Sequence, residues 1–234
     1  MRRIILFVIM TCLLGTGTAL AQTRASAVTH ASASRKMVGR APTAEEIQAK
    51  GDDLTRKACE LTREERRTDA IRLLDEACDL YRQAAGMYYQ KGTKGKEMSA
   101  LEGLAKALRQ KIFNLFELSF SETTYKGNYE HQAMVYRRTF AAFPIFIQKL
   151  NYGLATVAIT HEAYDQALPL LESARTKCSA NPESEALKTK SMGDMALCHM
   201  HLGHHDKARR LIREAIERAP SDNRLRQILK QIGN

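Results

Sequence analysis

Apolar side chains recur every three or four positions along most of this chain, which is the spacing that one face of an α-helix requires. The clearest run lies between residues 71 and 88. Its members are Ile71, Leu74, Cys78, Tyr81, Ala85 and Tyr88. Similar stripes predict helices over about 44–61 and 96–118, and Thr43 with Glu46 forms a capping-box pattern before the first. The sequence therefore predicts an all-α protein.

The breaks between these helices are unequally marked. Gly92 and Gly95 interrupt the pattern clearly, whereas the charged stretch 62–69 contains neither Gly nor Pro. The stripes on its two sides are out of phase by about one residue. We expect a turn there, and one long bent helix is the alternative.

The second half of the sequence repeats itself. The segment 164–167 followed by Ala174 has the same spacing as the segment 205–208 followed by Ala215. Pro220 then closes the second copy. Self-similarity at a period of about 20–50 residues is typical of helical repeat arrays, in which each unit buries its apolar face only against its neighbours.

The last copy resembles a tetratricopeptide repeat. Leu202-Gly203 stands at the turn between two helices, small alanines stand at 208 and 215 where the helices pack closely, and Pro220 ends the unit. The same register places units at about 189–222, 148–181 and, more weakly, 113–146, where Gln132 and Thr139 occupy the small positions. The resemblance implies an α-α superhelical solenoid of helix hairpins, with degenerate copies over 43–112 and better ones over 113–234.

Two further segments complete this expected array. Residues 221–233 carry a stripe of Leu225, Ile228, Leu229 and Ile232, which predicts a capping helix over the open end. The unit at 148–181 has Glu162 in place of the turn glycine. Extra residues separate it from the next unit, and they include Asn181-Pro182, a good N-cap followed by a good first helical residue.

The N-terminus has the three parts of a secretory signal. Two arginines follow Met1, residues 4–14 are almost wholly apolar, and residues 19–21 supply a small-x-small cleavage pattern. We therefore expect residues 1–21 to be a signal peptide and the protein to be exported, either periplasmic or secreted. The apolar run is shorter than the roughly 20 residues of a membrane span. No stable membrane anchor is expected, although a permanent N-terminal anchor is the alternative interpretation.

The positive charge is unevenly distributed. The formal net charge is +10, and residues 22–42 hold Arg24, Arg35, Lys36 and Arg40 with no acidic side chain. This stretch is rich in Ser and Ala and lacks apolar periodicity, which predicts a disordered basic leader. No basic stripe interleaved with aromatic residues is present, so we expect no nucleic-acid partner.

Four cysteines follow the signal segment, at Cys59, Cys78, Cys178 and Cys198. The first two would lie unequally far from a turn between them, by about 9 Å at 1.5 Å per residue. The last two are worse placed still, and a disulfide needs Cα atoms within about 7 Å. We expect four reduced, mostly buried thiols.

The segment 198–206 gathers a thiol and several imidazoles. Cys198 and His201 share a helix face, and both side chains are ligands that zinc or copper accepts. In the repeat register, however, Cys198 faces the helix-packing interface and Gly203 separates the two halves of the segment. We prefer this packing interpretation and assign no metal site.

The sequence contains no pattern that indicates catalysis. It has no GxSxG, no HExxH and no phosphate loop. We expect the phenylalanines at 113, 116, 120, 140, 143 and 146 to be core residues, with a groove as their alternative role. We therefore expect no enzymatic activity and no cofactor.

In the tetratricopeptide family, the first helices of the pairs line a concave groove that holds peptides or protein segments. By register, the resemblance implies partner-binding roles for Lys149, Tyr152, Thr156, Thr160, Lys190, Leu197 and His201. This mixture suits an extended, partly anionic segment. We expect an exported scaffold or adaptor for protein-protein interaction in the cell envelope. The alternative is a small-ligand-binding component of an envelope complex, with the aromatic helices lining a pocket.

Overall fold

The computed structural model describes residues 40–176 and 181–233. Within these ranges the chain forms helices and no strand, which confirms the all-α prediction. In chain order they are α2 (Ala44–Arg63), α3 (Arg67–Gln90), α4 (Lys94–Ser119), α5 (Thr124–Thr139), α6 (Pro144–Thr160), α7 (Tyr164–Thr176), α8 (Pro182–His201), α9 (His205–Arg218) and α10 (Asn223–Ile232). The expected signal peptide lies outside the described residues, and so does the expected leader except for residues 40–42.

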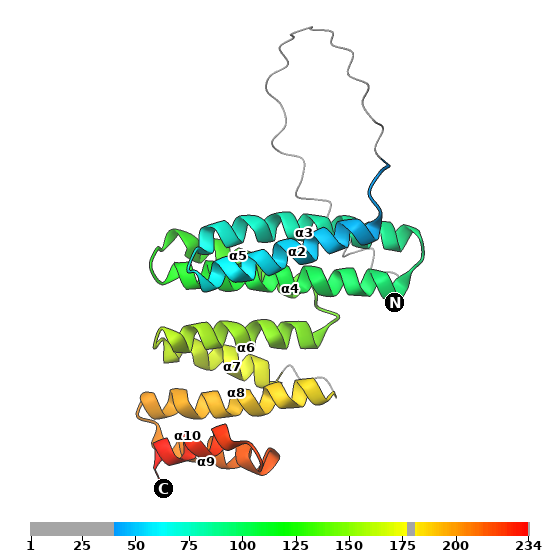
Figure 1. The fold of residues 1–234 in the computed structure, drawn as a ribbon. Coiled ribbons are helices and arrows are strands. Elements are labelled where there is room, and N and C mark those ends of the chain that lie inside the picture. Colours follow the sequence, from blue (N-terminus) through cyan, green and yellow to red (C-terminus); the bar gives the residue numbers. More distant parts are fainter. Residues whose placement is uncertain (1–39, 177–180, 234) are drawn as a thin grey trace.

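Consecutive helices pair and stack in sequence order (Figure 1). The pairs are α2 with α3, α4 with α5, α6 with α7 and α8 with α9, and α10 packs on both α8 and α9. Direct contacts between α2 and α4, α4 and α6, and α6 and α8 join the first helices of successive pairs. The arrangement is the helix-hairpin solenoid with a C-terminal capping helix that the repeat pattern implies.

The first pair begins and turns as the sequence indicates. The Thr43 hydroxyl accepts a hydrogen bond from the Glu46 backbone at 3.2 Å, and the Glu46 carboxylate accepts one from the Thr43 backbone at 2.7 Å. This is the expected capping box. Residues 64–66 form a turn, with Glu65 at φ 61°, so α2 and α3 are two helices and not one bent helix.

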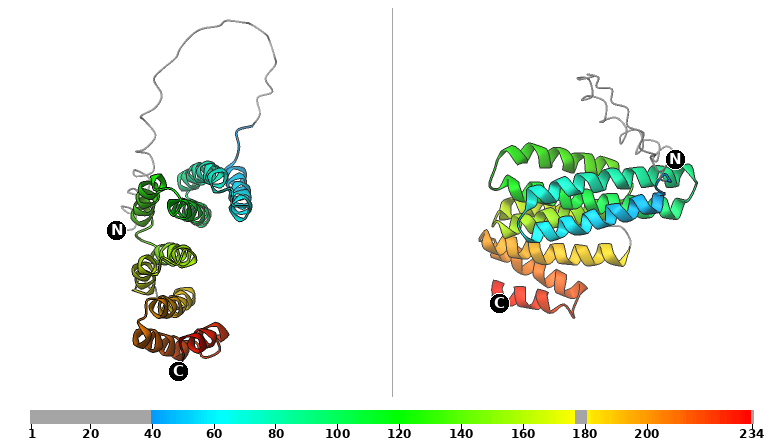
Figure 2. Two further views of the ribbon diagram at one scale, coloured as in Figure 1. Left: turned by 90° about the vertical axis from the view of Figure 1, so that its left-hand side faces the viewer. Right: turned by 45° about the horizontal axis from the view of Figure 1, so that its top comes forward.

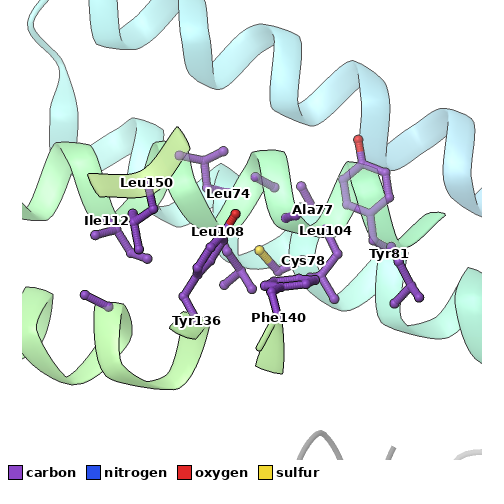
Figure 3. Packing of buried hydrophobic residues seen from close by; sticks show 14 of the residues in the cluster. Leu74, Ala77, Cys78, Tyr81, Leu104, Leu108, Ile112, Tyr136, Phe140 and Leu150 are labelled. Atoms are coloured by element: carbon purple, nitrogen blue, oxygen red, sulfur yellow. The ribbon is translucent and has the colours of Figure 1, made fainter. Parts of the chain in front are cut away.

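The main hydrophobic core runs through the stack rather than lying within each pair. Figure 3 shows side chains from α3, α4, α5 and α6 meeting in it. They include Leu74, Cys78, Tyr81, Leu104, Leu108, Ile112, Tyr136, Phe140 and Leu150. A second cluster joins α8, α9 and α10 around Met192, Ile212 and Leu225. Burial across pairs explains why the units need one another.

The middle unit has a different register from the expected one. Helices α4, α6 and α8 end 41 residues apart, at 119, 160 and 201. Ala133, Ala174 and Ala215, which keep the same 41-residue spacing, are all buried. Ala133 is therefore the small packing residue of α5, whereas Gln132 is partly exposed. The expected unit at 113–146 also runs into α6, and the division between residues 112 and 113 falls inside α4.

The extra residues before the last unit lengthen its first helix. Helix α8 begins at Pro182, and the Asn181 side chain accepts a hydrogen bond from the Ser184 backbone at 2.7 Å. Helix α10 buries Leu225, Ile228 and Ile232. Among the described helices, none combines the length and the apolar character of a membrane span.

Candidate partner-binding face

The first helices of the pairs line one side of the stack. Viewed along the helix axes in the left panel of Figure 2, α4, α6 and α8 follow one another, with α2 and α10 at the two ends of the row and α5, α7 and α9 behind it. We call the side chains of Lys149, Tyr152, Thr156, Thr160, Lys190, Leu197, His201 and Arg224 on this row the inner face. Seven of them are the residues predicted from the repeat register, and Arg224 is added by the structure.

Helix α6 contributes an exposed polar stripe. Tyr152, Thr156 and Thr160 are spaced by four and share one helix face. The Thr156 hydroxyl donates to the Tyr152 carbonyl and the Thr160 hydroxyl to the Thr156 carbonyl, each at 3.0 Å. Because these donors are used within the helix, the two hydroxyl oxygens face solvent mainly as acceptors.

A polar network ties α6, α8 and α10 together at the middle of this face. The buried carboxylate of Asp194 on α8 accepts a hydrogen bond from the Arg224 guanidinium on α10 and another from the Tyr152 hydroxyl on α6. Burial and the adjacent Asp194 raise the pKa of Tyr152 to about 12. A buried carboxylate with two donors holds its neighbours in place, because losing either donor leaves its charge undersatisfied.

The two predicted lysines have different surroundings. The Lys149 ammonium forms an ion pair with Glu183 at the start of α8, at 2.6 Å. Lys190 is exposed and forms no ion pair with the other described residues. It lines a shallow depression of about 380 Å³ together with Glu185, Thr189, Arg218 and Asp222. Lys190 is therefore the more available cation for an anionic partner.

Leu197 and His201 stand further along α8. Leu197 is half-buried and packs against the second core cluster. The exposed His201 imidazole stacks on the Tyr164 ring, with centroids 4.4 Å apart and planes 2° from parallel. The structure thus places the predicted residues on neighbouring helices of one row. Their role in binding stays a prediction.

Sequence reasoning missed the buried polar residues that support this face. Gln148 and Ser184 bond to each other between α6 and α8, at 2.7 and 3.0 Å. Asn151 bridges Arg137 on α5 and Ser173 on α7, at 2.9 Å each. A polar residue at an apolar register position was the only available signal, and it names no partner.

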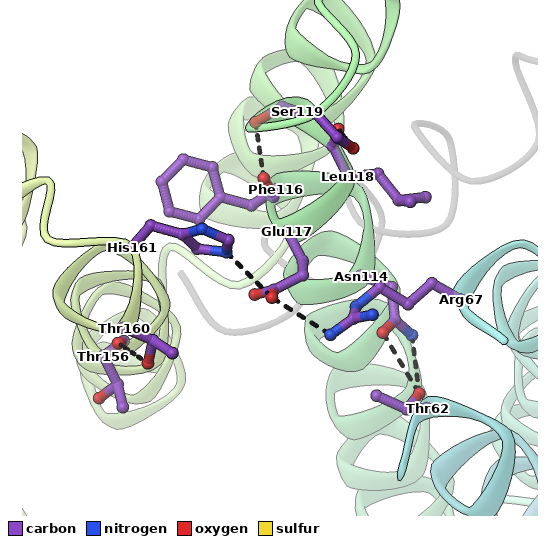
Figure 4. A network of polar contacts seen from close by, with 11 residues as sticks. Thr62, Arg67, Asn114, Phe116, Glu117, Leu118, Ser119, Thr156, Thr160 and His161 are labelled. Carbon is purple, nitrogen blue, oxygen red and sulfur yellow. Dashed lines mark hydrogen bonds and ion pairs between the residues drawn. The ribbon is translucent and has the colours of Figure 1, made fainter. Parts of the chain in front are cut away.

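A second network joins the N-terminal pairs to the repeats that follow. The Glu117 carboxylate of α4 receives Arg67 of α3 at 3.2 Å and His161, after α6, at 3.0 Å (Figure 4). The His161 ring also stacks on Phe120, with centroids 4.1 Å apart. These contacts fix the direction in which α6 leaves the longer helices above it.

The cysteines and phenylalanines serve packing. Cys78 and Cys198 are buried free thiols, Cys59 is a half-buried one, and Cys178 lies outside the described residues. Burial raises the pKa of the Cys78 and Cys198 thiols to about 12. The six phenylalanines at 113, 116, 120, 140, 143 and 146 are in the main core or packed against it. Their core interpretation is thereby confirmed.

The structure does not bring Cys198 and His201 together as a metal pair. Cys198 points into the core, whereas His201 rests on Tyr164. No group of three His, Cys, Asp or Glu side chains converges within the described part of the chain. Burial, followed by nearby His204 and Lys207, lowers the pKa of His199 below its usual range.

Comparison with known proteins agrees with this geometry. Residues 158–232 match a family model described as a tetratricopeptide repeat. The matched segment contains the end of α6 and the helices α7 to α10. No curated protein matches the chain as a relative. Tetratricopeptide repeats are typically non-catalytic scaffolds for protein-protein interaction.

Proposed function

From the tetratricopeptide repeat at residues 158–232, we propose that this protein is an exported scaffold or adaptor. It holds an extended segment of a partner protein on the inner face. The observation that carries the proposal is the network through buried Asp194, which joins α6, α8 and α10 beneath exposed polar side chains. A face that is ordered before binding loses less conformational entropy when a partner docks.

The chemistry of the face favours a polar and partly anionic segment. Thr156 and Thr160 offer hydroxyl acceptors, and Lys190 offers an ammonium group with three donors. Lys149 and Arg224 add positive charge, but each already has a carboxylate neighbour. Lys190 is therefore the cation from which we expect the largest electrostatic contribution.

Export is the second part of the proposal, and residues 1–21 support it. The test is N-terminal mass spectrometry of the protein recovered from its own cells, separated into envelope, medium and cytosol. We expect a mature chain that begins at Gln22, outside the cytosol. A chain that retains Met1 and remains in the cytosol would contradict export without affecting the binding proposal.

Site-specific photo-cross-linking tests the binding face. The cross-linking amino acid replaces Thr156 or Lys190, and Arg210 on the exposed surface of α9 serves as the matched control. We expect the two inner-face positions to capture the same partner in an envelope extract, on one contiguous segment. Equal capture from position 210, or none from 156 and 190, would contradict the proposal.

The same purification distinguishes the small-ligand alternative. The phenylalanines that a ligand pocket would have used are in the core or packed on it. A small molecule that co-purifies at one equivalent, with no protein partner, would replace the scaffold proposal by the ligand-binding one.

A further inference from the structure

The turn between α8 and α9 fixes two histidines side by side. The His204 backbone N–H donates to the His199 carbonyl at 2.7 Å, and the Gly203 N–H donates to the Met200 carbonyl at 3.0 Å. Gly203 has φ 77°. These two bonds and the left-handed residue define a Schellman motif, which brings the side chains at its ends, here His199 and His204, into contact.

The same motif occurs 41 residues earlier, between α6 and α7. There the Ala163 N–H donates to the Ala158 carbonyl and the Glu162 N–H to the Ile159 carbonyl, each at 2.9 Å. Ala158 and Ala163 occupy the places of the two histidines, and such an apolar pair is what usually accompanies the motif. Packing of this turn therefore needs no imidazole, and the histidine pair is a departure within the same fold.

The two imidazoles face each other through the same ring nitrogen. The His199 Nδ1 and His204 Nδ1 atoms are 3.3 Å apart, and the ring planes meet at 56°. Two nitrogens that bind one tetrahedral metal at 2.0–2.1 Å are separated by about 3.3 Å. The observed pair thus has the bite of a chelate, and the turn holds it without any metal present.

We propose that His199 and His204 form a two-ligand site for a divalent transition-metal ion, Cu²⁺ or Zn²⁺. Imidazole nitrogen is a ligand that both ions accept, and copper is expected to bind more tightly. Both rings then carry their proton on Nε2, so that each Nδ1 lone pair meets the ion. Within the described residues no third His, Cys, Asp or Glu completes the group, so water fills the remaining positions.

The surroundings allow access and limit affinity. His204 is exposed and His199 is half-buried, so an ion reaches the pair from solvent. The exposed Lys207 on the first turn of α9 is the charged group that acts on His199 besides His204. Its positive charge opposes the bound cation, and Lys207→Gln is therefore expected to strengthen binding.

Calorimetric titration of the untagged mature chain with CuCl₂ and with ZnCl₂ tests the site. We expect one ion per chain in the wild type. Losing a direct ligand should cost at least the roughly tenfold that a supporting residue costs, so His199→Ala and His204→Ala should each weaken binding by that factor or more. His205→Ala and His201→Ala are the matched controls, since each also removes one exposed histidine of the same turn.

Circular dichroism of each variant without metal establishes that it is folded. His204→Ala, at an exposed position, keeps the test valid if His199→Ala disturbs the turn. No measurable binding would overturn the proposal. Binding that is unchanged in His204→Ala, or lost equally in His205→Ala, would overturn it as well. None of these outcomes depends on whether the inner face binds a protein.

Discussion

Single residues hold the hairpin turns of this array in an unusual backbone conformation. Glu162 has φ 57° at the α6–α7 turn, where Gly203 has φ 77° at the α8–α9 turn. The left-handed region costs an L-residue roughly 1–2 kcal/mol, whereas glycine adopts it freely. The same turn thus forms with and without glycine, because packing of the two helices fixes it.

This strain gives a prediction at position 162. Glu162→Gly should raise the free energy of unfolding by about 0.5 kcal/mol, since relief of strain is partly offset by the greater freedom of glycine in the unfolded chain. Urea denaturation measures the change. Glu162→Ala is the control, because it removes the charge but keeps the strain. A gain for alanine as large as that for glycine would show that charge, not backbone, is responsible.

Tyr152 gives a prediction on pH. Its pKa is raised to about 12 by burial and by Asp194, whereas an unfolded tyrosine titrates near 10. Between about pH 10 and 12 the folded state therefore binds more protons, and stability falls as the pH rises. Relative to Tyr152→Phe, the wild type should lose stability between pH 8 and pH 11. Parallel urea midpoints for the two proteins would contradict the burial of this phenol.

The cysteines differ in their expected reactivity. Alkylation requires the thiolate, and pKa values of about 12 leave Cys78 and Cys198 as thiols near pH 8. Peptide mass spectrometry after iodoacetamide treatment should show both protected in the native protein and modified in urea. Half-buried Cys59 should react first among the three. Native labelling of Cys198 as fast as that of Cys59 would place it outside the core.

At the scale of helices, close approach at small residues decides the packing. Phe113 of α4 lies over Gly153 of α6, and Leu225 of α10 lies over Gly193 of α8. A Cβ at either glycine would overlap the facing side chain. Buried Ala167 and Ala208 have the corresponding role between the two helices of a pair. The alanines were predicted from the repeat pattern, but the glycine contacts were not, because they depend on bulky residues far away in the sequence.

Enlarging one of these contacts tests the packing. Ala208→Leu should destabilise the protein by about 1–3 kcal/mol, since a fully buried methyl group has no room for three more carbons. Thermal and urea unfolding measure the loss. Arg210→Leu, which adds the same side chain at an exposed position of α9, should change stability by less than about 0.5 kcal/mol. Equal effects of the two substitutions would refute the assigned register.

At the scale of the molecule, the chain is an array whose ends differ. Helices α3 and α4 are 24 and 26 residues long, whereas α7 and α9 have 13 and 14. Contacts of α4 with α6 and the bonds of Glu117 to Arg67 and His161 join the long pairs to the short ones. The row of first helices continues across this junction (Figure 2).

Local patterns explain why the sequence predicted some parts of this array and not others. Periodicity, the cap at Thr43 and the alanines of the last unit predicted the helices and their order. The middle unit was misregistered because a 34-residue repeat was assumed where the helices recur at 41. The Tyr152, Asp194 and Arg224 network joins three separate helices. No local pattern reports such a contact.

Charge reversal at Lys190 tests the central claim most directly. The partner segment captured by cross-linking is synthesised and titrated into wild type, Lys190→Glu and Arg210→Glu, of which the last makes the same change in net charge on exposed α9. We expect Lys190→Glu to weaken binding by about tenfold, which corresponds to ~1.4 kcal/mol, and Arg210→Glu to leave it nearly unchanged. Equal affinities for Lys190→Glu and the wild type would contradict binding on the inner face.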